Sequence, residues 1–395
     1  MRILYGIAGV GMGHATRSKV SISHLLRRGH DVLAACSDEA YSMFAPWRPE
    51  RALRIEGLSI RCTGGEFDLR RTLEDTARRL ASIMRENAVA WQEAERFRPD
   101  AVIGDYEWFA WAFARAHGLP ILSIDNAQLL NRCLHNPSVL EVCPAGFQLL
   151  AGFTESVAPD CNHYIITSVA SPTPTVRPEF AHNTTLIPPI LKDAVVRKLA
   201  ETTRGPRIER EDESGPVLMY KTSVLDDESF LDVLASIPEA RFIVYGLTST
   251  RTPPNVTAKP VDEASFLADL ASSRAVVSTG GMTLMGEAVA FGKPVFSVPV
   301  RGQYEQVFNG RYLELSGAGE MSPSFDPARL RGFLERVPRY RAALRAAPRH
   351  DANAKLFATL DALFPSALLP PPFRSLRELP VVGSGVSLPG AMGRR

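Results

Sequence analysis

The sequence has few cysteines and no long apolar run. Its five cysteines form an odd set without a Cys-x-x-Cys pair, which fits reduced thiols in the cytosol rather than a disulfide framework. No apolar stretch reaches the ~20 residues that a membrane-spanning helix needs. The amino terminus enters a strand pattern at once, unlike a secretory signal. These absences predict a cytoplasmic protein that is at most peripheral to a membrane.

The sequence also lacks a strong charge bias. Forty-five basic and 43 acidic residues give a net charge of +2, and no basic block with interleaved aromatics predicts a nucleic-acid partner. Arginines along one predicted helix, Arg70 to Arg79, could touch an anionic lipid, but a solvated helix face is favoured. Neither the histidines nor the acidic residues have metal-ligand spacing, so we expect no metal site.

Residues 276–306 are the most informative segment. An apolar run is followed by Gly280 and Gly281, a helical pattern that stops at Gly292, a second apolar run to Pro299 and a polar loop. Glycines allow an anion to approach the backbone, and the start of the next helix directs free N–H groups at it. Glu287 lies one turn after Thr283, where a carboxylate can accept hydrogen bonds from both hydroxyls of a ribose.

This segment also has a plain structural interpretation. Gly280 and Gly281 would then form an ordinary strand-to-helix turn, and Glu287 would be a solvated helix residue. Thr222 and Ser223, just after another predicted strand, could likewise donate hydroxyl groups to a diphosphate or simply form a local turn.

A second glycine loop lies near the amino terminus. The apolar run from Arg2 to Ala8 leads into glycines at 9, 11 and 13, followed by His14 and an amphipathic helix. The third glycine of a dinucleotide fingerprint is replaced, by His14 or by Thr16 depending on the starting glycine. The pattern is therefore a strand, a glycine loop and a helix, but not a dehydrogenase site.

Together these segments resemble the two-domain GT-B glycosyltransferases over roughly residues 1–365. Among these, the chain is similar to the bacterial and archaeal group that resembles the lipid-intermediate N-acetylglucosaminyltransferase and the UDP-glucuronosyltransferases. Its donor motif has a Gly-Gly turn, a hydroxyl residue, a helical Glu, Gly-x-Pro and an acidic or amide pair, and the order and spacing match here. The matching residues are Gly280, Gly281, Thr283, Glu287, Gly292, Pro294, Gln303, Glu305 and Gln306.

The resemblance implies a role for each of these residues. Gly280, Gly281 and Thr283 would hold the donor diphosphate, Glu287 its ribose, and Gln303, Glu305 and Gln306 the sugar hydroxyls. Gly13 would also face the donor, and backbone groups near Val261 would bind the base. His14 corresponds to the histidine that faces the interdomain cleft in that family.

His14 is the predicted general base. An imidazole titrates near neutrality and can remove a proton from an attacking acceptor hydroxyl, and this role implies an inverting reaction. Asp105 ends the apolar run 101–104 and would pair with His14 at the carboxyl edge of a parallel sheet. Glu107 and Asp125 compete with Asp105 for this role. For each carboxylate, helix capping is an alternative, and His14 could instead bind the donor phosphate.

Length and periodicity predict the architecture. A chain of 395 residues is longer than one core usually organises, so two domains are expected. Apolar strands near 2–8, 31–36, 101–104 and 120–124 alternate with helical patterns such as Thr72 to Arg96, as in a parallel, helix-covered α/β sheet. We expect Rossmann-like domains at 1–190 and 191–365, joined near Pro188 and Pro189, with a Pro- and Gly-rich tail at 366–395.

The sequence therefore predicts a metal-independent glycosyltransferase without a cofactor. It would move a sugar from a nucleotide-diphosphate donor, as in UDP-sugar enzymes, to a hydroxyl-bearing small molecule, glycan or lipid-linked acceptor. Two alternatives remain open, a nucleotide-sugar epimerase of the same fold and a non-catalytic nucleotide-sugar-binding protein.

Overall fold

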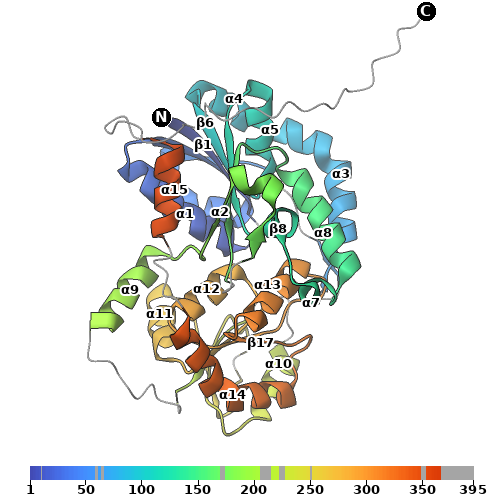
Figure 1. The fold of residues 1–395 in the computed structure, drawn as a ribbon, viewed down its shortest axis with the longest axis vertical. Coiled ribbons are helices and arrows are strands. Elements are labelled where there is room, and N and C mark those ends of the chain that lie inside the picture. The colour runs from blue at the N-terminus through green and yellow to red at the C-terminus, as the bar shows by residue number, and fades with distance from the viewer. Residues whose placement is uncertain are drawn as a thin grey trace, which may run out of the picture.

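A computed structural model of the protein describes most of the chain. The described residues are 1–9, 11–57, 61–63, 66–169, 174–204, 215–221, 227–249, 251–347 and 353–365. They form two α/β domains, one above the other in Figure 1.

The first domain is built on a parallel sheet in the order β11-β9-β7-β6-β1-β2-β3. The inner strands are almost completely buried, because helices cover both faces of the sheet, and this explains their continuous apolar sequences. The edge strands β3 and β11 are only partly buried. The strands are β1 (Arg2–Ile7), β2 (Asp31–Cys36), β3 (Ala52–Arg54), β6 (Ala101–Asp105), β7 (Ile121–Asp125), β9 (His163–Thr167) and β11 (Thr184–Ile187).

Helices and short elements surround this sheet. The helices are α1 (Met12–Arg27), α2 (Asp38–Trp47), α3 (Leu69–Glu86), α4 (Ala88–Phe97), α5 (Trp108–His117), α6 (Leu129–Arg132), α7 (Pro137–Leu140) and α8 (Pro144–Val157), with 3₁₀ turns η1 (Pro49–Arg51) and η2 (Pro178–Asn183). Two small antiparallel pairs join β4 (Cys62–Thr63) to β5 (Glu66–Phe67) and β8 (Cys133–Leu134) to β10 (Thr175–Val176).

The helical pattern expected from Thr72 to Arg96 is two helices rather than one. The break falls at Asn87, which lies between α3 and α4. Its side chain accepts a hydrogen bond from Glu56 N at 2.7 Å and donates one to Glu56 O at 3.0 Å. A tertiary contact therefore interrupts a pattern that is continuous in the sequence.

The second domain has a parallel sheet in the order β14-β13-β12-β15-β16-β17. Its strands are β12 (Val217–Tyr220), β13 (Phe242–Tyr245), β14 (Val256–Lys259), β15 (Ala275–Ser278), β16 (Val295–Ser297) and β17 (Gly319–Met321). Its helices are α9 (Asp193–Arg204), α10 (Asp227–Ala235), α11 (Glu263–Ser272), α12 (Met282–Ala290), α13 (Tyr304–Leu315) and α14 (Pro327–Ala346).

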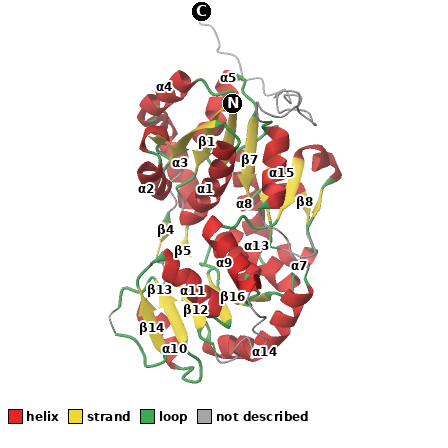
Figure 2. Ribbon diagram, turned by 90° about the vertical axis from the view of Figure 1, so that its left-hand side faces the viewer, coloured by secondary structure: helices red, strands yellow, loops and turns green. Residues whose placement is uncertain are grey.

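The last helix, α15 (Ala354–Leu363), returns to the first domain. Leu356, Leu360 and Leu363 belong to the same buried cluster as β1 and α1, and Figures 1 and 2 show α15 beside the upper sheet. The expected second domain, 191–365, is therefore wrong at its carboxyl end. The amphipathic pattern of α15 predicts a buried face but does not tell which domain buries it.

Each sheet has one point where its strand order reverses. In the first sheet the reversal lies between β1 and β6, and in the second between β12 and β15. At such a switch point the two outgoing loops separate and leave a crevice at the carboxyl ends of the strands, where α/β proteins bind ligands. The two candidate glycine loops follow β1 and β15, so both lie at switch points.

Candidate active site

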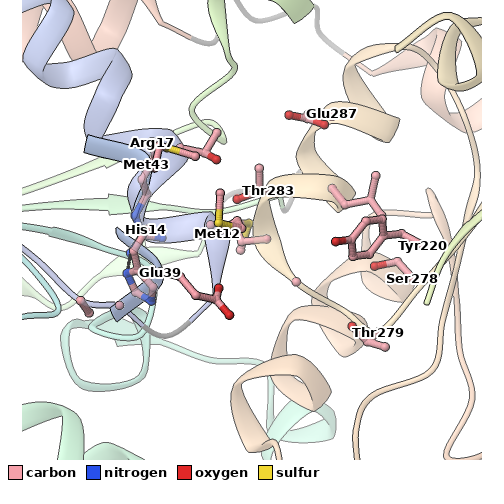
Figure 3. Close-up of a pocket in the computed structure, with 18 of the residues that line it drawn as sticks. Met12, His14, Arg17, Glu39, Met43, Tyr220, Ser278, Thr279, Thr283 and Glu287 are labelled. Carbon is pink, nitrogen blue, oxygen red and sulfur yellow. Dashed lines mark hydrogen bonds between the residues drawn. The ribbon is translucent and has the colours of Figure 1, made fainter. Parts of the chain in front are cut away.

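One cavity of about 1390 Å³ is lined by both switch points. Figure 3 shows Met12, His14 and Arg17 on one side and Thr283 and Glu287 on the other. Pockets for one small ligand are typically about 300–1,000 Å³. The cavity therefore has room for two substrates.

His14 and Asp105 meet at the first switch point. His14 lies in the first turn of α1, and Asp105 is the last residue of β6. The His14 Nδ1 atom is 2.8 Å from Asp105 Oδ1, and the side chain of Asp105 is fully buried while that of His14 is 18% exposed. With Nδ1 turned to the carboxylate, Nε2 is the nitrogen left for a ligand in the cavity.

Arg17 and Ser18 complete the surroundings of Asp105. Arg17 Nε and Ser18 Oγ each donate to Asp105 Oδ2 at 2.8 Å, and Arg17 Nη2 donates to Oδ1. Burial raises the pKa of the Asp105 carboxyl, but the charges of Arg17 and His14 outweigh burial and lower this pKa to about 2. Asp105 is therefore ionised at neutral pH.

Arg17 also constrains the tautomer of His14. Its Nη2 lies 2.8 Å from His14 Nδ1, and a guanidinium group only donates hydrogen bonds. The imidazole can thus accept from Arg17 at Nδ1 or donate to Asp105 from Nδ1, but a neutral ring cannot do both. The negative charge of Asp105 favours a proton on Nδ1, which leaves Nε2 able to accept one.

Sequence reasoning missed Arg17, although a signal was present. Arg17 follows His14 by three residues, so the two side chains share one face of α1. A charged residue on an amphipathic helix is normally assigned to the solvent face, whereas Arg17 is buried. Tyr106 was also missed: it has a φ of 53° and its ring stacks on His14 with the centroids 6.0 Å apart.

Glu107 and Asp125, the alternative partners of His14, have other contacts. The Glu107 carboxylate caps α5 by accepting hydrogen bonds from Phe109 N at 2.9 Å and Ala110 N at 2.8 Å, and burial raises its pKa to about 7. Asp125 accepts hydrogen bonds from Gln128 N and Ser123 Oγ, both at 2.8 Å. Glu107 thus caps a helix, and Asp125 makes local hydrogen bonds at the end of β7.

The second switch point presents the Gly280–Gly281 turn. Gly280 has a φ of 88°, and a Cβ atom there would lie 2.8 Å from Gln306 O, so this position needs glycine. Gly281 precedes the first residue of α12, and a Cβ there would meet nothing within 4 Å. The amino end of α12 is thus open to the cavity and can bind an anion.

The two helix amino ends approach each other closely. A Cβ atom on Gly13 would lie 3.1 Å from Thr283 Oγ1, although Gly13 belongs to α1 and Thr283 to α12. The free N–H groups of both helices therefore border the same part of the cavity, where their positive dipole ends add.

Glu287 is buried and lines the cavity. Its Oε1 atom lies 3.2 Å from Lys192 Nζ, and Lys192 is also 3.5 Å from Glu263. Among the described residues this Oε1 has no hydrogen-bond partner. Burial raises the pKa of Glu287 in spite of Lys192. Beyond the ion pair with Lys192, the carboxylate oxygens have lone pairs that can accept hydrogen bonds from a hydroxyl ligand.

The polar residues after Pro299 also line the cavity. Gln303 precedes α13, and Glu305 and Gln306 lie in its first turn. The Gln306 Oε1 atom accepts a hydrogen bond from Val300 N at 2.9 Å, which fixes that side chain. Val261 lines the cavity from the loop before α11 and is 65% exposed.

Not every predicted site residue can be placed. Thr222 and Ser223 lie outside the described residues, and the neighbouring Lys221 lines the cavity. In the described part of the chain, no group of three or more His, Cys, Asp or Glu side chains could hold a metal ion. Within the same residues, no helix is long and apolar enough to cross a bilayer.

Comparison with known proteins identifies similar chains. The family model described as glycosyl transferase family 1 matches residues 1–338. A relative from Methanosarcina mazei, named an uncharacterized glycosyltransferase, is 26% identical over 342 residues, which cover 81% of this chain and 85% of the relative.

Solved glycosyltransferases are similar in fold. CalG4, the calicheamicin glycosyltransferase, has a TM-score of 0.59 and 19% identity, with 92% of this chain and all of that chain covered. VinC, solved in complex with dTDP, also has a TM-score of 0.59, with 18% identity and 91% and 98% covered. The two parallel-sheet domains are therefore the GT-B architecture, as the sequence predicted.

Proposed function

The chain belongs to glycosyl transferase family 1 and is a glycosyltransferase of the GT-B type that uses a nucleotide-sugar donor; we propose that it transfers the sugar to a hydroxyl-bearing acceptor with inversion and without a metal ion. The observation that carries this proposal is the meeting of two switch points in one cavity. The first switch point contributes the His14–Asp105 pair. The second contributes the open amino end of α12, with Glu287 one turn further along this helix.

The donor lies along α12 in this proposal. Its diphosphate is held at Gly280, Gly281 and Thr283, with Gly13 facing it from α1, since these residues border the helix amino ends. Glu287 accepts hydrogen bonds from the ribose hydroxyls through its carboxylate, whose Oε1 pairs with Lys192 but makes no hydrogen bond among the described residues. The base lies near Val261, where backbone groups recognise it.

The sugar and the acceptor lie between α13 and α1. Gln303, Glu305 and Gln306 contact the sugar hydroxyls, since they line the cavity at the amino end of α13. His14 then faces the reacting carbon from the opposite wall. Thr222 and Ser223 remain proposed diphosphate contacts on the basis of the sequence alone.

His14 acts as the general base. Its Nε2 atom takes the proton of the acceptor hydroxyl while that oxygen attacks the anomeric carbon, and the bond from this carbon to the diphosphate oxygen breaks. The leaving diphosphate keeps the electron pair, and the amino end of α12 stabilises its charge. Attack from the face opposite the leaving group inverts the anomeric centre. Asp105 stabilises the imidazolium that forms.

The test is incubation of the purified protein with UDP-, dTDP- and GDP-sugars, with and without a panel of phenolic, glycan and lipid-linked alcohols. UDP-sugars come first because of the sequence resemblance, and dTDP-sugars because VinC was solved with dTDP. We expect release of nucleoside diphosphate and a product of inverted anomeric configuration by NMR, both unaffected by a chelator.

Other outcomes would identify a different activity. Interconversion of sugar isomers without transfer would indicate an epimerase, and binding without turnover would indicate a sensor. Retention of configuration in the product would contradict the role of His14 as the base in a single displacement.

A further inference from the structure

A chain of buried amide contacts connects the first domain to the Gly280–Gly281 turn. Asn126, just after β7, donates through Nδ2 to Asn309 Oδ1 at 3.2 Å. Asn309, on α13, donates through its own Nδ2 to the Gly280 carbonyl oxygen at 3.1 Å. Asn126 is 4% exposed and Asn309 is 1% exposed. Hydrogen bonds buried this deeply are costly to leave unmade.

Asn309 lies on α13, and contacts with both domains hold this helix in place. The neighbouring Phe308 and, one turn on, Tyr312 are buried in a core cluster of the first domain. The Tyr312 hydroxyl lies 2.7 Å from His135 Nδ1 of that domain. On the other side, the Gly280 turn rests on the backbone of α13 at Gln306. Asn309 therefore lies between two surfaces that it connects.

The contact with the Gly280 carbonyl fixes the next N–H group. A trans peptide is planar, and its C=O and N–H bonds point in opposite directions. The carbonyl of Gly280 and the N–H of Gly281 belong to the same peptide, so holding the carbonyl against Asn309 directs the Gly281 N–H away from α13. Gly281 lines the cavity, and a Cβ there would meet nothing within 4 Å.

We propose that Asn309 is a positioning residue that orients the Gly281 N–H toward the donor diphosphate, and that Asn126 couples this orientation to the first domain. The inference rests on the proposed function, since it assumes that a diphosphate binds at this turn. It adds that the donor site is ordered in part by a residue of the acceptor-binding domain.

The test compares diphosphate binding with nucleoside binding. Dissociation constants of UDP, dTDP and GDP, and of uridine, thymidine and guanosine, are measured by calorimetry for the wild type, Asn309→Ala, Asn126→Ala and the double variant. Asn162→Ala is the matched control, because its side chain also makes a hydrogen bond with the backbone, accepting at Oδ1 from Ile121 N at 2.9 Å, and does not line the cavity. Thermal unfolding of every variant separates binding from stability.

We expect Asn309→Ala to weaken binding of the preferred nucleoside diphosphate about tenfold and to leave binding of its nucleoside unchanged. Asn126→Ala should weaken diphosphate binding about threefold in the wild-type background and have no effect in the Asn309→Ala background. Asn162→Ala should lower the melting temperature without changing either dissociation constant.

Each contrary outcome has a distinct meaning. If Asn309→Ala weakens nucleoside and nucleoside diphosphate equally, or neither, Asn309 has only a structural role and the inference is wrong. If the effect of Asn126→Ala persists in the double variant, Asn126 contacts the ligand directly and the coupling is wrong. Should Asn309→Ala fail to fold, an unchanged diphosphate affinity in Asn126→Ala would overturn the coupling. Wild-type protein that binds none of the three nucleoside diphosphates would overturn the proposed function as well.

Discussion

The amino ends of α1 and α12 occupy equivalent places in the two domains but carry different chemistry. Each follows a central strand at a switch point and begins after a glycine turn. The first turn of α1 contains His14, which is joined to Arg17 and Asp105. The first turn of α12 contains no acidic residue, and Glu287 lies further along the helix.

This difference shows how one topology supports two tasks. At α1 the buried charges of Arg17 and Asp105 compensate each other, which holds an imidazole at the cavity wall. The α12 helix, like α1, has no side-chain cap, and its open N–H groups next to the Gly280–Gly281 turn suit an anionic ligand. Changes at α1 should therefore affect the rate of transfer, and changes at α12 should affect donor binding.

Removal of the imidazole is the strongest way to test this division. In His14→Ala we expect kcat to fall by about a hundredfold to ten-thousandfold, because an oriented base contributes that much, with the dissociation constant of the nucleoside diphosphate nearly unchanged. Initial rates and calorimetry measure the two quantities. His24→Gln is the control, since His24 lies on the same helix but contacts Asp361. Donor hydrolysis that persists undiminished in His14→Ala would rule out the base assignment.

Glu287 tests the other side of the comparison. In Glu287→Gln we expect donor KM to rise by about tenfold to a hundredfold, because hydrogen bonds to a charged group are lost, while kcat changes much less. The same variant should bind a nucleoside with both ribose hydroxyls no better than its 2′,3′-dideoxy analogue, whereas the wild type should discriminate. Equal discrimination by both proteins would place the ribose elsewhere.

Substitutions of the adjacent glycines Gly280 and Gly281 should separate an effect on protein stability from an effect on donor binding. Gly280→Ala should lower the free energy of unfolding by about 1–3 kcal/mol, because a non-glycine residue is strained at positive φ and its Cβ meets Gln306 O at 2.8 Å. Gly281 has an ordinary φ of −66°, so the Gly281→Ala variant should fold normally. Its added methyl group should obstruct the diphosphate and raise the donor KM about tenfold. Chemical denaturation and donor kinetics check the pair, and reversed effects would contradict the placement of the diphosphate.

The smallest expected effect is a difference in pH dependence. The pKa of Asp105 is lowered from 3.8 to about 2 in the folded protein, so its contribution to stability is present above its ordinary pKa and is lost as pH falls through the folded value. The pKa of Glu287 is raised by burial, so its contribution is present in acid and is lost as pH rises through the folded value.

The two substitutions should therefore change the melting temperature in opposite directions. Asp105→Asn should have a lower melting temperature than the wild type at pH 7, and the difference should shrink as pH falls toward 3. Glu287→Gln should have a higher melting temperature than the wild type at pH 8, and its advantage should shrink in acid. Melting curves across this range test both, and a stabilised Asp105→Asn protein at pH 7 would contradict the charge arrangement at α1.

The sequence predicted the sheets and the two glycine loops well, for physical reasons. Strands buried on both faces have continuous apolar runs, so those expected near 2–8, 31–36, 101–104 and 120–124 match β1, β2, β6 and β7 closely. Glycine turns also leave a local signal. The roles proposed for the site residues remain predictions.

Features that depend on tertiary contact were not predicted. Arg17 and Asn309 resemble ordinary polar helix residues in the sequence, and their burial arises from partners that are distant along the chain, Asp105 and Asn126. The break at Asn87 depends on Glu56, and the placement of α15 depends on which apolar surface is free to receive it. Local pattern carries no information about such partners.

The return of α15 to the first domain limits how the two halves can move. The chain passes between the domains first after β11 and again between α14 and α15. At these crossings Leu191 N donates to Asn353 Oδ1 at 3.1 Å, and Asn353 Nδ2 donates to Leu191 O at 2.8 Å. Because these hydrogen bonds join the two interdomain connections, the connections should act as one hinge. We therefore expect substrates to enter and products to leave by rotation of the two domains about this hinge rather than by their full separation.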